Sequence, residues 1–474
     1  MGGELLNDAD FGVIGLAVMG QNLALNIEDK GYAVAVYNRT ADRTRQFIAR
    51  HPNKRFVPSE ALECFVSSLK RPCKILLLVR AGEPTGALLE QLFPLLETGD
   101  LVMDGGNAHY ADTDRRLEAA QARGLRYLGV GISGGESGAL RGPSIMAGGD
   151  EDAYPLVREL LEQIAAQGPQ GPCCAYFGPG SAGHYVKMVH NGIEYAMMQT
   201  LAESYDVMKC VLGMSVPEMA DVVGEWNRGE LAGYLFEITE KILRTFDPET
   251  GDPLVERILD QAEQKGTGKW STQSALDVGS PASTIASAVF ARLLSALKEE
   301  RVSAARSLPG PKPTRSIDRE AFLKALFGAA YLAVICAYAQ GMRQLHDSSV
   351  DRDYDLDLSE VARVWMAGCI IRAKLLVPIR TALIDRPDLP LLFLAEPFVT
   401  AWKRHHSDLR QVICTAHKWG IPVPVMDSAL DFLDGYRTGR LPANLTQAQR
   451  DFFGAHTYQR IDREGVFHTQ WEPA

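Results

Sequence analysis

Four polar residues interrupt an otherwise apolar segment, VKMVHNGIEYAMM, at a spacing typical of one helical face. They stand at positions i, i+3, i+4 and i+7 of a predicted helix and are Lys187, His190, Asn191 and Glu194. One such residue often has a structural explanation, because a lysine can extend to solvent and a histidine or asparagine can make an internal hydrogen bond. Four on a single stripe favour a chemical role.

An amine and a carboxylate on this stripe can perform acid–base chemistry. Desolvation can hold a buried lysine neutral, and a neutral amine near pH 7 is a general base. Glu194, further along the helix than Lys187, can then act as an acid. A base and an acid behind a nicotinamide pocket predict oxidation of an alcohol followed by a second proton-dependent reaction.

The nicotinamide pocket itself is predicted from a glycine-rich stretch near the start of the chain, GVIGLAVMGQNLALNI. Gly15, Ala17 and Gly20 stand between a predicted strand and a predicted helix, in the G-x-G-x-x-G arrangement with alanine in the middle. Gly15 permits a tight turn and Gly20 permits close packing of helix on sheet, while the Ala17 methyl should move the pyrophosphate slightly outward on the helix N-terminus. Such a loop often only turns a corner, but its place at the first strand–helix junction favours a dinucleotide site.

The end of the second predicted strand indicates which dinucleotide is bound. An NAD enzyme usually carries Asp or Glu here to accept hydrogen bonds from the ribose 2′-hydroxyl. This chain has Asn38-Arg39-Thr40, which supplies donors and a cation and so suits a 2′-phosphate. A solvated arginine at a strand end is the simpler alternative, but after the glycine loop the sequence favours NADP over NAD.

The first third of the chain alternates short β-rich runs with helical stretches, which predicts an α/β domain with a doubly wound, mostly parallel sheet. The predicted helices cover Gln21–Lys30, Ala111–Gly124 and Glu151–Gln167. The predicted strands are DFGVIGLA, YAVAVYN, KILLLV (74–79), DLVMDGG (100–106), LRYLGVGIS (125–133), SIMAGG (144–149) and CAYFG (174–178).

From Gly183 onward the pattern is almost entirely helical, and this predicts a large all-α domain. The Pro-rich stretch SLPGPKPTRS (307–316) cannot lie inside a helix. After Gly439 the chain is polar and aromatic with little amphipathic order, as in a tail that lies on another surface or chain. We therefore expect a dinucleotide-binding domain over residues 1–182, an all-helical domain over 183–439 and a C-terminal tail over 440–474.

The composition of the chain limits the kinds of partner that it can bind. The formal net charge of -10 argues against nucleic acid or an anionic membrane, so an anionic ligand must be held by a local cluster of Lys and Arg. The longest apolar run, Ala325 to Ala339, is shorter than a membrane span and predicts a core helix. Eight scattered cysteines without a CxxC pair indicate reduced thiols, with Cys173 and Cys174 inert in a loop or strand edge. The N-terminus has no secretory or myristoylation signal, and we expect a cytoplasmic protein.

The chain closely resembles the decarboxylating 6-phosphogluconate dehydrogenase family over nearly its whole length. The resemblance implies a Rossmann-like N-terminal domain, an all-helical domain, and a tail that reaches the partner subunit of a homodimer. It also implies an NADP-dependent oxidoreductase of the pentose phosphate pathway and gluconate utilisation. The matching stretches are GLAVMGQNLALNI, YNRT, LLLVRAG, DGGNAHY, GISGGESGALRGPSIMAGG, KMVHNGIEY, EWNRGEL, QKGTGKW, ALDVGSPASTIASAVFAR, AGCIIRAK and QRDFFGAHTY.

The resemblance assigns roles to residues of this chain. Lys187 matches the general base of the family and Glu194 its general acid. The implied NADP contacts are Gly15, Leu16, Ala17, Val18, Met19, Gly20, Asn38, Arg39, Thr40, Val79, Arg80, Ala81 and Asn107. The implied substrate contacts are Asn107, Ser133, Gly134, Gly135, His190, Asn191, Tyr195, Lys265, Thr267 and Arg292, with Arg450 and His456 contributed by the other protomer.

These assignments are chemically coherent. A sugar acid phosphate needs cations at both ends, and Lys265, Arg292 and Arg450 can enclose the phosphate while backbone N–H groups of residues 133–135 hold the carboxylate. Taken alone, KGTGKW would only be a turn at a helix end. No cluster of carboxylate, His or Cys residues in the sequence predicts a metal site, so we expect none.

A mechanism follows as a hypothesis. Neutral Lys187 takes the proton of the 3-hydroxyl while hydride leaves C3 for the nicotinamide. The resulting ketone is β to the carboxylate, and Lys187, now an ammonium, returns its proton to the ketone oxygen as CO2 departs. Glu194 then protonates C1 of the enediol to give ribulose 5-phosphate.

Departures from the family pattern are modest, and two other functions stay open. Ala196 and Met197 replace the usual Gly and Asp, Ser137 replaces a common Glu, Met366 replaces a usual Arg, and the 307–316 loop matches poorly. A related β-hydroxyacid dehydrogenase would oxidise without losing CO2, although a smaller acid needs no phosphate clamp. A non-catalytic NADP-binding protein is the third possibility, and intact Lys187 and Glu194 argue against it.

Overall fold

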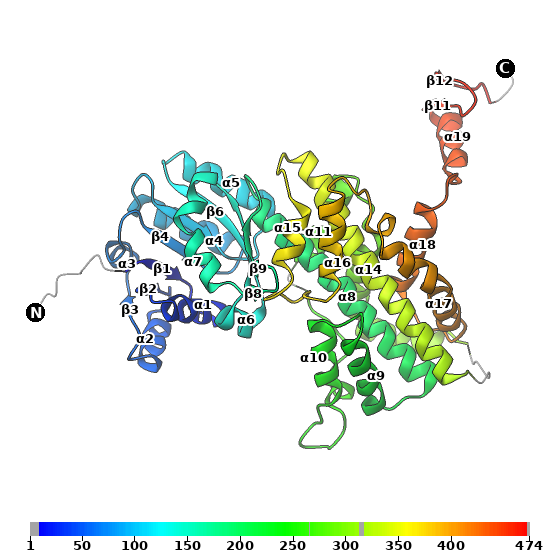
Figure 1. Ribbon diagram of the computed structural model, residues 1–474, viewed down its shortest axis with the longest axis horizontal. Coiled ribbons are helices and arrows are strands. Elements are labelled where there is room, and N and C mark those ends of the chain that lie inside the picture. The colour runs from blue at the N-terminus through cyan, green and yellow to red at the C-terminus, as the bar shows by residue number, and fades with distance from the viewer. Residues whose placement is uncertain (1–8, 265, 312–316, 472–474) are drawn as a thin grey trace, which may run out of the picture.

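The computed structural model describes residues 9–264, 266–311 and 317–471, which form two bodies and a tail (Figure 1). An eight-stranded sheet with its helices makes the N-terminal body, and the second body is almost entirely helical. Helix α8 (Ala182–Leu212) contacts the sheet and also the helices of the second body. The predicted α/β domain followed by a large all-α domain is confirmed.

The sheet has the strand order β10-β7-β6-β5-β4-β1-β2-β3, and every neighbouring pair is parallel except β6 and β7. Most central strands are buried on both faces, which explains why they appear in the sequence as short continuous apolar runs. The strands are β1 (Phe11–Ile14), β2 (Val34–Tyr37), β3 (Phe56–Ser59), β4 (Lys74–Leu77), β5 (Leu101–Asp104), β6 (Arg126–Ser133), β7 (Ser144–Gly149) and β10 (Cys174–Tyr176).

Helices cover both faces of this sheet, as a doubly wound fold requires. One apolar core joins the sheet to α1, α2 and α7, and a second core on the other face joins it to α3, α4 and α5. The elements of this body are α1 (Val18–Asp29), α2 (Ala41–Arg50), α3 (Leu62–Ser67), α4 (Glu83–Leu92), η1 (Phe93–Leu95), α5 (Tyr110–Gln121), α6 (Gly135–Arg141), η2 (Glu151–Leu156) and α7 (Arg158–Ile164).

Two local features differ from the sequence prediction. The single helix expected over Glu151–Gln167 is divided into η2 and α7, because Pro155 cannot donate a backbone hydrogen bond within a continuous helix. Strand β3 was not predicted; it contains Pro58 and lies at the edge of the sheet, where a proline is tolerated. A short hairpin of β8 (Gln167–Gly168) and β9 (Gly171–Pro172) follows α7.

The helical body is built around α8 and α14 (Arg319–Asp351), which pack against each other. By length and hydropathy α14 could cross a membrane, but most of its apolar stretch is buried among other helices, as predicted for a core helix. The remaining elements are α9 (Val216–Arg228), α10 (Tyr234–Leu243), η3 (Leu254–Glu256), α11 (Thr267–Asp277), α12 (Ser283–Ser295), α13 (Lys298–Ser307), α15 (Leu358–Val364), α16 (Leu376–Asp385), η4 (Leu392–Leu394), α17 (Phe398–Lys418) and α18 (Pro424–Tyr436).

Glycines allow the first turns of α8 to lie directly on the sheet. A Cβ added to Gly131 of β6 would lie 2.4 Å from Cβ of Lys187, and one added to Gly148 of β7 would lie 2.3 Å from the backbone nitrogen of Gly183. Gly183 of α8 is equally restricted by the sheet, since its added Cβ would lie 2.5 Å from the carbonyl oxygen of Met146. The sheet and α8 therefore meet backbone to backbone, and Lys187 is held against β6.

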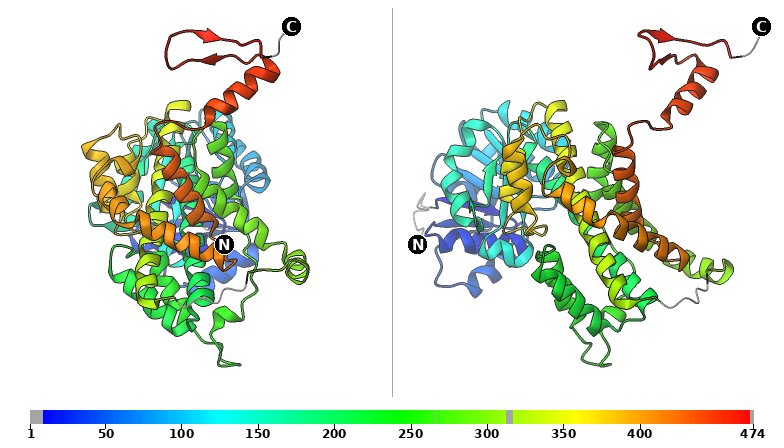
Figure 2. Two further views of the ribbon diagram at one scale, coloured as in Figure 1. Left: turned by 90° about the vertical axis from the view of Figure 1, so that its right-hand side faces the viewer. Right: turned by 45° about the vertical axis from the view of Figure 1, so that its right-hand side comes forward.

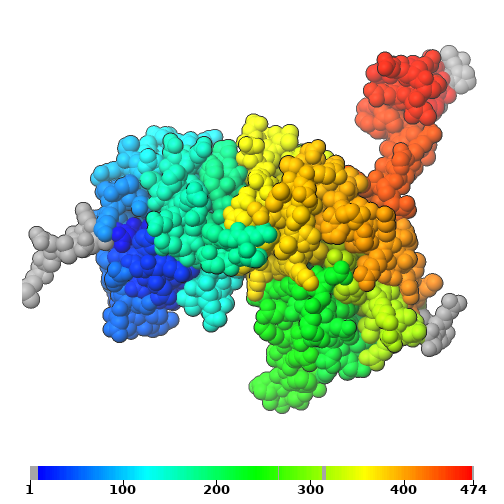
Figure 3. Space-filling model, in the orientation of Figure 1, coloured from blue at the N-terminus to red at the C-terminus, as the bar shows by residue number. Residues whose placement is uncertain are grey.

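The C-terminal segment extends away from both bodies (Figures 2 and 3). It consists of α19 (Ala443–Gly454) and a two-stranded hairpin of β11 (Tyr458–Gln459) and β12 (Val466–Phe467). The sequence did not predict this helix and hairpin. The buried Asp451 carboxylate joins the two, because it accepts hydrogen bonds from the backbone N–H groups of Thr457 and Thr469 and from the Trp471 indole.

Candidate active site

Three residues of the polar stripe of α8 are buried and the fourth, Glu194, is half-buried, and their side chains lie close together. Lys187 is 6% exposed and His190 0%. The Lys187 amine donates to Asn191 Oδ1 at 2.6 Å and lies 3.3 Å from His190 Nδ1. Glu194 Oε2 lies 3.9 Å from His190 Nδ1. The helical spacing therefore brings the amine, imidazole, amide and carboxylate together as the sequence predicted.

Burial favours the uncharged forms of the two titratable ends of this stripe. Desolvation lowers the pKa of Lys187, and the nearby Glu194 carboxylate only partly opposes this. Desolvation likewise raises the pKa of Glu194, against the opposing effects of Lys187 and Arg292. A neutral amine beside a protonated carboxyl is the combination that general base and general acid roles require.

His190 links the stripe to the sheet. Burial and the neighbouring amine lower its pKa well below the usual value, so the ring is neutral. Asn191 Oδ1 can only accept, and it lies 3.0 Å from Nδ1, which therefore carries the proton. The other ring nitrogen, Nε2, then accepts from the Ser133 hydroxyl at 3.2 Å. A hydrogen-bonded chain thus runs from the end of β6 to the Lys187 amine.

Ser133 opens a turn of two glycines between β6 and α6. Gly134 and Gly135 have φ angles of +123° and +62°, which a residue with a side chain rarely adopts. A Cβ on Gly134 would also lie 2.6 Å from the carbonyl oxygen of Gly368, which belongs to the helical body. Gly134 is therefore required by both its conformation and the space available, and Gly135 by its conformation alone.

The glycine loop has the geometry of a dinucleotide turn. Gly15 has φ +102°, and an added Cβ would lie 2.5 Å from the carbonyl oxygen of Leu78. Gly20 is needed because its Cβ would collide with the Gly15 carbonyl oxygen, at 1.8 Å. Ala17 and Val18 are exposed at the start of α1, so backbone N–H groups and the positive end of the helix are accessible to an anion.

Asn38, Arg39 and Thr40 lie next to this loop at the end of β2. Asn38 Oδ1 accepts from the backbone nitrogen of Leu16 at 3.0 Å, and its Nδ2 donates to the Thr40 carbonyl at 3.1 Å. Asn38 therefore ties the two segments together, while Arg39 and Thr40 are exposed. An exposed guanidinium and hydroxyl in this place, without an acidic residue, suit a phosphate better than a ribose hydroxyl.

Successive parallel strands bring the remaining cofactor and substrate segments to the same edge of the sheet. β1, β2, β4, β5 and β6 are mutually parallel neighbours, so their carboxyl ends lie together. These ends carry the glycine loop, residues 38–40, the turn Val79-Arg80-Ala81, Asn107 and residues 133–135. The crevice at the reversal of strand order, between β1 and β4, is where such sheets bind nucleotides.

The helical body places further side chains against Tyr195 of α8, two turns beyond Lys187. The Arg292 guanidinium of α12 stacks on the Tyr195 ring of α8 with 3.5 Å between Cζ and the ring centroid. Thr267 is the first residue of α11, and the following Gly268 packs on the same ring, since its added Cβ would lie 2.5 Å from Tyr195. Lys265, which the sequence placed with this group, lies outside the described residues.

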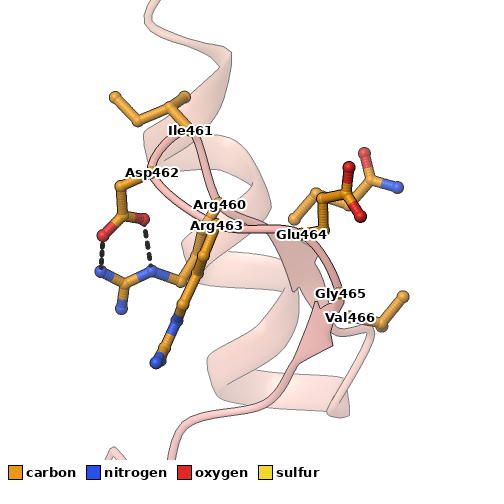
Figure 4. Close-up of a pocket in the computed structure, with 8 residues that line it drawn as sticks. Arg460, Ile461, Asp462, Arg463, Glu464, Gly465 and Val466 are labelled. Atoms are coloured by element: carbon orange, nitrogen blue, oxygen red, sulfur yellow. Dashed lines mark hydrogen bonds and ion pairs between the residues drawn. The ribbon is translucent and has the colours of Figure 1, made fainter.

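The structure does not bring Arg450 and His456 to the stripe of their own chain. Both are exposed on the tail, Arg450 in α19 and His456 just after it. The tail also carries a hollow of about 530 Å³ at the tip of its hairpin, where Arg460 forms two hydrogen bonds with Asp462 (Figure 4). This hollow lies far from α8 in every view and is not the candidate active site (Figures 1 and 2).

Residues of the segment between α15 and α16 also reach the site, and the sequence analysis assigned none of them. The Trp365 ring packs edge-on against His190 with 5.7 Å between centroids, and Cys369 is buried close enough to influence the pKa of Lys187. A signal was present for Cys369 alone, because it lies in AGCIIRAK, one of the stretches that carried the family resemblance. Among the described residues no group of three His, Cys, Asp or Glu side chains could hold a metal, and the absence of a metal stays a prediction.

Comparisons with known proteins cover the whole chain. Residues 10–178 match a family model described as the NAD binding domain of 6-phosphogluconate dehydrogenase, and residues 183–471 match its C-terminal domain. The chain is 50% identical to the NADP(+)-dependent, decarboxylating 6-phosphogluconate dehydrogenase of Bacillus subtilis (strain 168), over 98% of this chain and 100% of the relative. It is 52% identical to the decarboxylating enzyme of Synechococcus elongatus, over 97% and 99%.

A solved structure has the same fold over the same length. The 6-phosphogluconate dehydrogenase of Plasmodium falciparum, determined in its apo form and in complexes with its cofactor NADP+ and its substrate 6-phosphogluconate, superposes with a TM-score of 0.94. The two chains are 42% identical, and the match covers 98% of this chain and 100% of that one.

Proposed function

The chain belongs to the 6-phosphogluconate dehydrogenase family, and we propose that it oxidises and decarboxylates 6-phospho-D-gluconate to D-ribulose 5-phosphate and CO2 with reduction of NADP. Full-length similarity to decarboxylating, NADP-dependent relatives supports the overall reaction. The observation that carries the chemical proposal is the buried Lys187 amine, bonded to Asn191 at 2.6 Å and close to Glu194. We assign the enzyme to the cytoplasm and the pentose phosphate pathway; eight free cysteines accord with a reducing compartment.

The residues at the carboxyl edge of the sheet fit NADP. Gly15 gives the backbone room that a pyrophosphate needs, and the exposed start of α1 offers its N–H groups. Arg39 and Thr40 can contact the 2′-phosphate, with Asn38 keeping their strand end close to the glycine loop. The turn 79–81 and Asn107 lie at the neighbouring strand ends. When bound, NADP supplies the acceptor for the hydride that leaves the substrate.

Lys187 and Glu194 can supply the proton transfers of the reaction. Lys187, whose pKa is lowered by burial, accepts the proton of the 3-hydroxyl in its neutral form. The same amine, now protonated, returns the proton to the ketone oxygen as the C–C bond to the carboxylate breaks, so the electrons of that bond have a stabilised destination. Glu194, whose pKa burial raises, then gives its proton to C1 of the enediol, while Lys187 takes back the proton of the enediol hydroxyl to form the ketone of ribulose 5-phosphate.

Contacts around the stripe support the proposed binding of the sugar acid. Ser133 and the two following glycines offer backbone N–H groups to the carboxylate, while the Ser133 hydroxyl holds His190. Arg292, held over Tyr195, supplies a cation at the other side of α8. Thr267, the first residue of α11, would add a hydroxyl, and a contact from Lys265 stays a prediction.

We also propose that the active site is shared between two chains. The functional units would be residues 1–182 for NADP, 183–439 for substrate and dimerisation, and 440–474 as a tail that enters the partner's site with Arg450 and His456. The extended tail supports this division, since its Phe453 and Ile461 are 72% and 88% exposed and would gain contacts on another surface.

The overall reaction is tested by mixing the purified protein with NADP and 6-phosphogluconate and following both absorbance at 340 nm and release of CO2. We expect one CO2 for each NADPH. NADPH without CO2 would indicate a β-hydroxyacid dehydrogenase, and absence of NADPH would indicate a non-catalytic NADP-binding protein.

The shared site is tested by complementation. Lys187→Met and Arg450→Ala, each inactive alone, are co-expressed with different affinity tags so that mixed dimers can be purified. If Lys187 and Arg450 of one site come from different chains, each mixed dimer has one site with both residues intact, and about half of wild-type activity per dimer returns. If both residues come from one chain, no site is intact and the mixed dimer stays inactive.

A further inference from the structure

A buried ion pair lies between the cofactor side of the site and α8. Asp104 is the last residue of β5, and Arg116 lies on α5. Arg116 Nη1 donates to Asp104 Oδ2 at 3.0 Å, and their side chains are 4% and 2% exposed. Tyr127 OH donates to the same oxygen at 3.1 Å. Burying two charges is costly unless their hydrogen bonds are satisfied, so this pair calls for an explanation.

Each member of the pair holds one of the turns at the carboxyl edge of the sheet. Arg116 Nη2 donates to the Gly82 carbonyl at 2.7 Å, at the end of the turn that contains residues 79–81. Asp104 Oδ1 accepts from the backbone nitrogen of Gly106 at 3.0 Å, immediately before Asn107. The two turns proposed to contact NADP are thus joined through a single ion pair.

A third connection reaches the helix of the catalytic stripe. His184 lies one turn before Lys187 on α8 and is buried, which lowers its pKa and keeps the ring neutral. Its Nε2 lies 3.0 Å from the Asp104 carbonyl oxygen, so this nitrogen must carry the proton. The other nitrogen, Nδ1, accepts from the Thr113 hydroxyl of α5 at 2.7 Å.

We propose that Asp104 and Arg116 are positioning residues, which set the two cofactor turns at a fixed place relative to Lys187. This inference rests on the proposed function, since it concerns the distance between the hydride acceptor and the base. Neither residue touches a reacting atom. Their role is to prevent the turns at 79–82 and 105–107 from moving independently of α8, because a small displacement of reacting groups is costly in rate.

Asp104→Asn is the informative change, because it preserves the shape of the side chain. A carboxylate has two accepting oxygens, one for Gly106 N–H and one for Arg116 and Tyr127, whereas an amide has only one. In either orientation of the amide, one of these connections is lost. Arg116→Lys is a second variant, since an ammonium can keep the contact to Asp104 but cannot also reach Gly82 as the guanidinium fork does.

Asp100, immediately before the same strand, offers a matched control. It precedes β5 at the opposite edge of the sheet and is also buried. One oxygen accepts from the backbone nitrogen of Cys73 at 2.6 Å, and the other from the backbone nitrogen of Glu97 and from Arg71. Asp100→Asn therefore breaks a carboxylate of the same hydrogen-bonding type without touching the cofactor turns.

The three variants and the wild type are compared by thermal unfolding, by steady-state kinetics, by NADPH fluorescence titration, and by the isotope effect with 3-deuterated 6-phosphogluconate. We expect Asp104→Asn and Arg116→Lys to raise the KM for NADP and the Kd for NADPH about tenfold or more. The isotope effect should rise as hydride transfer becomes slower relative to the other steps. Asp100→Asn should lower the melting temperature with less than about a twofold change in either constant.

Equal kinetic constants in Asp104→Asn, Arg116→Lys and Asp100→Asn would overturn the proposal and leave the pair a purely structural one. If Asp104→Asn does not fold, Arg116→Lys decides, because it retains the charge. The NADPH titration is independent of turnover. A wild type that binds NADPH but does not reduce NADP would therefore contradict the proposed function, while the titrations would still test the positioning role.

Discussion

Replacing Lys187 by methionine tests the proposed general base with little change in packing. Methionine fills a similar volume, and the lost hydrogen bond to Asn191 at 2.6 Å costs about 0.5–1.5 kcal/mol. Removal of a desolvated amine offsets part of that cost, because burial disfavours its charged form. We therefore expect the free energy of unfolding to change by less than about 1 kcal/mol.

The effect on catalysis should be much larger. General base catalysis typically contributes about 10²–10⁴-fold, or about 3–5 kcal/mol of barrier. The variant should thus lose at least about 100-fold in the rate of NADP reduction, measured in single turnover at 340 nm. The affinity for NADPH should be nearly unchanged, because the cofactor segments lie at the strand ends and not on α8.

The pH dependence of kcat/KM tests whether Lys187 acts as a base. A base must be unprotonated, so wild-type kcat/KM should fall as the pH drops through the lowered pKa of Lys187. Residual activity of the Lys187→Met variant should lack this acidic limb. Lys209→Met is the control, since Lys209 lies on the same helix but is paired with Glu256 at the surface. A Lys187→Met enzyme with more than about a tenth of wild-type activity would refute the assigned base.

Two other changes examine the cofactor site and a buried carboxylate. Arg39→Ala should raise the KM for NADP about 10–100-fold and the KM for NAD little, because only NADP offers a 2′-phosphate to the guanidinium. Arg45→Ala serves as the control, since Arg45 is already paired with Asp42. Equal increases in the KM for both nucleotides would contradict 2′-phosphate recognition. Glu203 is 2% exposed, and burial raises its pKa to about 8 from 4.5. The folded state therefore binds the extra proton between these values, and the free energy of unfolding should fall by about 5 kcal/mol as the pH rises through this window. Glu203→Gln should remove that slope in urea titrations between pH 5 and 8, and an unchanged slope would show that the group is ionised throughout.

The sequence predicted those parts of the molecule whose side-chain pattern depends on local geometry. The strands follow from short continuous apolar runs, which indicate burial on both faces, and the stripe on α8 follows from the helical period of 3.6 residues. The role of Gly15 followed from the turn that it must make. The break at Pro155 could have been predicted by the same reasoning, because proline cannot continue a helix.

Other parts depend on contacts between distant segments, which a single sequence does not reveal. Trp365 meets His190 across 175 positions of the chain, and no local pattern indicates it. The tail helix α19 leaves Phe452 and Phe453 exposed, so its sequence lacks the amphipathic pattern of a helix packed on its own domain. The pair of Asp104 and Arg116 could not be predicted for the same reason, since Asp104 appears in the sequence only as the end of a strand.

The backbone contact between Gly131, Gly148 and Gly183 restricts how this protein can be re-engineered. A chimera that grafts another nucleotide domain onto the helical half would have to inherit all three residues, because any one methyl group would lift α8 and carry the amine away with it. Recombination points should therefore lie outside this backbone contact. The same contact lies directly beneath the amine, so a substitution on either side of it would also displace Lys187.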